Sequence, residues 1–139
     1  MKLSLSTHPN TTILYLLAAL IAGAVLFFDL SLPLGVAAGV PYIALVLLGV
    51  WFPKIGPVIA LAAIGTALTI FGYVMSEPGG IPWMVLANRA IAIVAIWVTA
   101  ILIVLEKKAS EALRLSAIEA EQARAVAEAA NRAKSEFLA

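Results

Sequence analysis

Long apolar runs, separated by short polar breaks, occupy most of the chain. They extend over residues 13–28, 33–52, 58–75 and 83–105. Each run is close to the ~20 residues that an α-helix needs to cross the hydrocarbon core of a bilayer. The connections are short, so successive helices are expected to lie antiparallel. The pattern therefore predicts an all-α membrane protein, an antiparallel bundle of four transmembrane helices.

Polar residues and prolines mark the ends of these runs. The first run opens after Asn10 and closes at Asp29, and Pro33 is well placed to begin the second helix. Pro41 falls inside the second run, where a proline removes a backbone hydrogen bond, so a kink is expected there. The glycine- and proline-containing segment 76–80 predicts a loop before the fourth run.

The N-terminus allows an alternative interpretation, a cleaved signal peptide. Lys2 supplies a positive charge ahead of the apolar run, and residues 22–24 are small, as a cleavage site requires. The apolar run nevertheless continues past these small residues to Phe28. This continuation favours a retained membrane helix.

Composition and charge divide the chain into two parts. Hydrophobic residues make up 63% of the chain and charged residues only 12%, whereas soluble domains carry about 25% charged residues. Five charged residues precede Glu106, and the other twelve follow from there to the end. We therefore expect a four-helix transmembrane domain over residues 1–105 and a water-exposed segment over residues 106–139.

Several kinds of function are disfavoured by composition. The net charge of +1 gives no sign of a nucleic-acid partner. The absence of cysteine excludes disulfides, thiolate metal sites and cysteine catalysis, and His8 alone cannot build a multi-histidine metal site. No phosphate-binding glycine loop and no nucleophile with a base in reach is apparent. We expect no catalytic residue, metal or cofactor in this chain.

The basic residues predict the orientation in the membrane. An even number of crossings places both ends of the chain on one side. Asp29 and Glu77 would lie on the opposite side from the basic residues of the short loops and the helix ends, which are Lys2, Lys54, Lys107, Lys108 and Arg114. Because basic residues favour the cytoplasmic side, both termini are expected in the cytoplasm.

The polar segment 106–139 has the composition of a single long helix. It contains no glycine or proline and is rich in Ala, Glu, Arg and Leu, which are strong helix formers. Small and apolar residues alternate at spacings of four and three, a heptad pattern that indicates a dimeric coiled coil. These residues are Ala109, Leu113, Ser116, Ala120, Ala123, Ala127, Ala130 and Phe137. A solvated single helix is the alternative, because most of these positions are alanine.

Arg89 is the most informative residue of the membrane part. An ionisable side chain at this depth is costly and is usually paired or turned toward the bundle interior. Asp29 is the expected partner, and Glu77 is the second candidate. Other polar residues of the same outer half could complete a cluster, namely Asn88, Tyr42 and Tyr73. The cluster is either a ligand or signal site, or an ion pair that only fixes helix packing; a snorkelling arginine is a further alternative.

Glycines in the apolar runs suggest close helix packing. Gly35 and Gly39 form a G-x-x-x-G pattern, and Gly65 and Gly72 lie two turns apart on one helix face. Small residues at such spacings let helix backbones approach closely. Packing within one bundle is favoured here over a contact between two copies.

The last ten residues read A-N-R-A-K-S-E-F-L-A. They resemble the opening of the dimerisation and phosphotransfer domain of bacterial sensor histidine kinases, where a similar string leads directly into the motif with the phosphorylated histidine. The preceding segment is similar to the signalling helix that joins a sensor to that domain. The resemblance implies a sensor domain over 1–105 and a signalling helix over 106–139. No catalytic residue of the family is carried onto this chain.

The resemblance implies transmembrane signal input to a homodimeric, hybrid-type two-component histidine kinase in the bacterial cytoplasmic membrane. ATP and Mg²⁺ would serve only the kinase domains of such a protein, and its partner would be a response regulator or receiver domain. A small dimeric four-helix transporter is the second hypothesis, although it needs an acidic residue well inside the bilayer. A plain membrane anchor for a kinase is the third.

Overall fold

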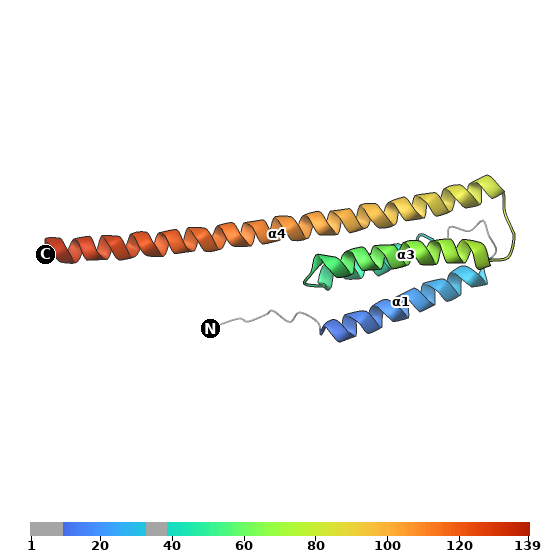
Figure 1. Cartoon of the computed structure of the whole chain (residues 1–139), viewed down its shortest axis with the longest axis horizontal. Helices are drawn as coiled ribbons and strands as arrows, with labels where there is room; N and C mark the ends of the chain where they lie inside the picture. The colour runs from blue at the N-terminus through green and yellow to red at the C-terminus, as the bar shows by residue number, and fades with distance from the viewer. Residues whose placement is uncertain (1–9, 33–38) are drawn as a thin grey trace. The chain divides into compact units, whose positions relative to one another are not determined.

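The computed structural model describes residues 10–32 and 39–139, and the regular structure of these residues is helical throughout. The elements, in chain order, are α1 (Thr11–Ser31), α2 (Tyr42–Leu47), the 3-10 helix η1 (Leu48–Trp51), α3 (Ile55–Met75) and α4 (Pro82–Leu138) (Figure 1). The all-helical expectation is therefore confirmed for these two ranges.

Three helices are long and apolar enough to cross a membrane: α1, α3 and α4. Many of their large apolar side chains are exposed, among them Leu20 at 68%, Val74 at 63% and Leu86 at 61%. A water-soluble fold of this size would bury such residues, whereas lipid tails solvate them. The chain is thus a membrane protein in the coarse sense that the sequence predicts.

The second apolar run differs from its prediction. Its residues 33–38 lie outside the described ranges, and the remainder forms the shorter apolar helix Tyr42–Trp51. Pro41 does not kink a longer helix; it closes a turn over 39–41 and immediately precedes α2. Proline lacks an N–H and is tolerated at the start of a helix, where its backbone nitrogen needs no partner. The helix then tightens from α to 3-10 form at Leu48.

Local sequence explains the other helix ends. Asn10 caps α1, because its Oδ1 accepts a hydrogen bond of 3.1 Å from the backbone N–H of Thr12. The helix α3 ends where Ser76 takes an extended conformation. Gly80, in the connection to α4, has φ of 71°, in the left-handed region that glycine adopts most easily.

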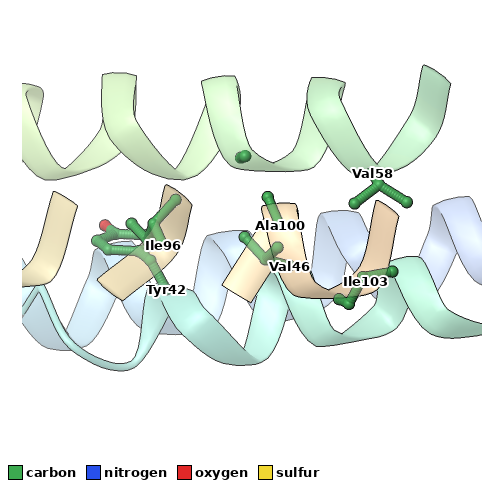
Figure 2. Close-up of a cluster of buried hydrophobic side chains, with 7 residues drawn as sticks. Tyr42, Val46, Val58, Ile96, Ala100 and Ile103 are labelled. Carbon is green, nitrogen blue, oxygen red and sulfur yellow. The ribbon is translucent and has the colours of Figure 1, made fainter. Parts of the chain in front are cut away.

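Two apolar clusters hold α1, α2, α3 and the first part of α4 together. The first joins α2, α3 and α4 (Figure 2) through Tyr42, Val46, Val58, Ala62, Ile96, Ala100 and Ile103. The second joins α1, α2, η1 and α3 through Leu14, Ala18, Leu45, Leu48, Phe52 and Leu61. The short helix α2 contributes to both clusters and is the shared centre of the packing.

The chain divides into two compact units, Met1–Val104 and Leu105–Ala139. The division lies beside the change in composition at Glu106. The second unit is helical up to Leu138, and every residue from Lys108 onward is exposed. Arg124 and Glu128 form an ion pair of 2.9 Å across one turn of this unit. Such exposed pairs add only a few tenths of a kcal/mol.

Candidate functional site

A buried ion pair links α1 to α4. The guanidinium of Arg89 donates from Nη1 to Oδ2 of Asp29 at 2.8 Å and from Nη2 to Oδ1 at 2.7 Å. Asp29 is only 1% exposed and Arg89 only 7%. The two parallel hydrogen bonds form the bidentate geometry that a planar guanidinium makes with a carboxylate. The expected pairing of Arg89 with Asp29 is present.

Two glycines make room for this pair. A methyl group at Gly72 of α3 would overlap Oδ2 of Asp29. A methyl group at Gly39 would lie 2.9 Å from the Cβ of Ala92 and 3.7 Å from Nη1 of Arg89. The backbones around the ion pair therefore approach more closely than any larger residue would allow. The G-x-x-x-G spacing pointed to Gly39, but its role beside Arg89 depends on the fold.

The C-terminal end of α3 also contacts the end of α1. Ser76 follows the last residue of α3, and its hydroxyl donates to the backbone carbonyl of Asp29 at 3.4 Å. Asp29 thus meets α4 through its side chain and the end of α3 through its backbone. Charges buried in this way are costly to separate, because either one alone would remain without a partner in a poorly solvated site.

Tyr42 places a further polar group in this half of the molecule. Its side chain is completely buried, and its hydroxyl has no hydrogen-bond partner among the residues that the structure describes. The hydroxyl lies at the Ile96 side of the first cluster, away from Val58 and Ile103 (Figure 2). This hydroxyl is therefore a buried polar group whose hydrogen-bonding capacity is not used by the described residues.

The remaining predicted cluster residues differ in their exposure. Tyr73 is 43% exposed on the surface of α3, and Asn88 is half-buried on α4. Glu77 is exposed and lines a separate polar pocket of about 370 Å³ together with Ser31 and Met75. The arginine is bonded to Asp29 and not to this second candidate.

The predicted coiled-coil residues all belong to the second unit. All eight are exposed, Leu113 at 73% and Phe137 at 88%. An exposed stripe of small and apolar residues on a helix is available to a second helix.

One polar contact was not predicted. The indole N–H of Trp97 on α4 donates to the hydroxyl of Thr66 on α3 at 3.1 Å, and that hydroxyl in turn donates to the carbonyl of Ala62 at 2.8 Å. A threonine inside an apolar run was the available signal, because its hydroxyl needs partners within the membrane.

Comparison with known proteins identifies no relative: no family model, no curated protein and no solved structure matches this chain. Within residues 10–32 and 39–139, no group of three or more His, Cys, Asp or Glu residues could hold a metal ion.

Proposed function

We propose that this chain is the transmembrane input and relay part of a two-component histidine kinase of the hybrid type. The observation that carries the proposal is the course of α4, a single α-helix of 57 residues. Near its start, Arg89 is bonded to α1, and at its end stands the K-S-E-F-L-A string, which resembles the opening of a phosphotransfer domain. One element therefore carries both the candidate sensing residue and the segment that resembles a kinase.

The sequence of α4 suits it to transmit a movement. From Trp83 to Phe137 it contains no glycine and no proline, the residues at which helices most often bend or break. A change in the Asp29–Arg89 pair would alter the tilt or rotation of α4 at the ion pair. With no flexible residue between, that change would reach the polar segment. A ligand or membrane signal that favours one arrangement of the pair would shift the kinase between output states.

The proposal includes four membrane crossings with both termini in the cytoplasm. It is supported by the ion pair, because Asp29 lies near the end of α1 and Arg89 near the start of α4. Single cysteines at Lys54 and Glu77 test it in intact cells with an impermeant thiol reagent. We expect labelling at position 77 and none at position 54. The reverse pattern would contradict the proposed orientation.

The partners follow from the proposed class. The polar segment would pair with the same segment of a second copy along the heptad stripe, and the bilayer would surround the apolar helices. The kinase domains would use ATP and Mg²⁺ and pass the phosphoryl group to a response regulator or receiver domain. The protein would reside in the bacterial cytoplasmic membrane, with no role in nucleic-acid binding.

A fusion protein tests the proposed function. The chain is joined at Leu138, in the helical register of the resemblance, to the phosphotransfer and ATP-binding domains of a histidine kinase. Autophosphorylation is measured in membranes. The control carries an unrelated single transmembrane helix in place of residues 1–105. We expect Arg89→Ala to change the rate of the first fusion at least severalfold, because releasing α4 shifts the populations of the output states.

The same experiment separates the proposal from a plain anchor. If the two fusions have equal rates and Arg89→Ala has no effect, the membrane part only tethers the kinase. The transporter hypothesis has less support, because a carboxylate that exchanges protons must be free to do so. Asp29 has both carboxylate oxygens bonded to Arg89.

A further inference from the structure

An apolar groove of about 470 Å³ lies between α1 and α3. It exists because its walls are made of small residues: Ala18 and Ala22 on α1, and Gly56 and Ala60 on α3. A methyl group added at Gly56 would meet no atom within 4 Å. Leu45 and Leu61, both buried, also line it. The groove thus follows from the small residues that face it, and its lining includes neither the ion pair nor the polar segment.

The position of the groove limits what can fill it. Both helices are long and apolar enough to cross a membrane, so the groove faces the bilayer. Its volume falls within the ~300–1,000 Å³ of common ligand pockets, and its lining is almost entirely apolar. The occupant must therefore be an extended apolar chain or a helix of another protein.

One end of the groove carries a positive charge. Gly56 and Pro57 line the groove in the first turn of α3, and Lys54 directly precedes that helix. Lys54 is exposed, and because Arg89 is buried and paired, Lys54 is the one exposed basic side chain within the described residues up to Glu106. Its long, flexible stem lets the ammonium group reach a neighbouring anion.

Aromatic residues mark the same end as a membrane interface. Tyr15 lines the groove, and its ring packs against that of Phe52 at a centroid distance of 5.1 Å. Trp51 is 52% exposed just before the Lys54 turn. Amphipathic aromatic rings at this level are typical of the headgroup region of a bilayer. The groove therefore extends from headgroup depth into the hydrocarbon core.

We propose that the groove between α1 and α3 binds an acyl chain of an anionic phospholipid, with the lipid phosphate paired to Lys54. The apolar groove matches the acyl chain of such a lipid, and Lys54 at its end matches the negatively charged headgroup. A second copy of the chain fits less well. In a symmetric membrane dimer formed through this groove, the two Lys54 side chains would stand at the same depth beside the interface and repel each other. This site does not depend on the proposed function.

Native mass spectrometry of the purified chain tests the proposal. The chain is released from micelles that contain equal amounts of phosphatidylglycerol and phosphatidylcholine. We expect bound phosphatidylglycerol to predominate. The substitution Lys54→Gln should lower that preference about fivefold, the effect of one basic residue at an anionic surface. The matched control Lys108→Gln, in the polar segment, should leave it unchanged.

A second pair of variants tests the groove itself. Ala60→Phe fills it, whereas Ala67→Phe places the same ring on an exposed position of α3 outside the lining. Ala60→Phe should reduce retention of both lipids at least threefold, and Ala67→Phe should not. Circular dichroism should show equal helix content in all variants.

Three outcomes would overturn the proposal. Equal retention in Ala60→Phe and Ala67→Phe would show that the lipid binds elsewhere. An unchanged preference in Lys54→Gln would show that the charge does not select the lipid. A dimer of the unmodified chain that dissociates only in Ala60→Phe would show that a second copy occupies the groove.

Discussion

Removing either partner of the Asp29–Arg89 pair should strongly destabilise the membrane part. In Arg89→Ala, the carboxylate of Asp29 would lose both hydrogen bonds while only 1% exposed. Breaking a buried ion pair at one side costs about 3–5 kcal/mol. We therefore expect each single substitution to alanine to cost about 3 kcal/mol.

The double variant, in which both Asp29 and Arg89 are alanine, tests the interaction between the two residues more directly. With both charges removed, no group is left unpaired, and the remaining loss comes from packing around the two shortened side chains. We expect it to cost little more than either single variant, which corresponds to a coupling energy of about 3 kcal/mol between the two residues. Arg89→Lys should fall between Arg89→Ala and the unmodified chain, because an ammonium keeps the charge and loses the bidentate geometry.

Unfolding in mixed micelles with increasing SDS measures these differences. Tryptophan fluorescence is a suitable signal, since Trp97 of α4 is bonded to Thr66 of α3. Glu77→Ala is the control: this residue is exposed, so its cost should stay within about 0.5 kcal/mol. The loss in free energy of unfolding in the double variant could instead equal the sum of the losses in the two single variants. That result would refute the coupling and the structural role given to the pair.

Two further predictions concern the helix contacts. Gly72→Ala should destabilise the chain by at least about 2 kcal/mol in the same assay, because its methyl group would overlap Asp29, whereas Gly23→Ala, with open space around it, should be neutral or slightly stabilising. In membranes, a cysteine at Ala120 on the heptad stripe should form a disulfide between two copies on mild oxidation, and one at Ala125 on the opposite face should do so at least fivefold more slowly. Equal cross-linking at both positions would contradict the predicted stripe.

Patterns of apolar residues predicted the long helices well, because an uninterrupted apolar run has few other structures available in a bilayer. They were less useful for the second run. Its length suggested one helix, yet the chain turns at residues 39–41 and α2 begins at Tyr42. A turn inside an apolar run depends on how the neighbouring helices pack. Gly39 is an example, because it lies in this turn and packs beside Ala92 and Arg89 of α4. The local sequence gives no information about such a contact with a distant helix.

The part of the candidate site that depends on charge pairing was predictable from the sequence. A buried arginine needs a partner, and Asp29, at the end of the first apolar run, was the first of two candidates, so the pair could be inferred without the fold. The sequence did not separate Tyr42 from Tyr73, although one is fully buried and the other 43% exposed. Which face of a helix meets its neighbours depends on the rotation of the helix, and nearly uniform apolar composition leaves that rotation open.

The central claim is that α4 carries the signal as one stiff helix, and an insertion series in the fusion protein tests it most directly. One residue inserted between Leu105 and Lys108 rotates everything after it by about 100°, and seven residues nearly restore the original face. Autophosphorylation should therefore depart from the original rate at one or two inserted residues and return close to it at seven. The same rate at every insertion length would contradict the claim, because a signal carried by the helix must depend on its rotation.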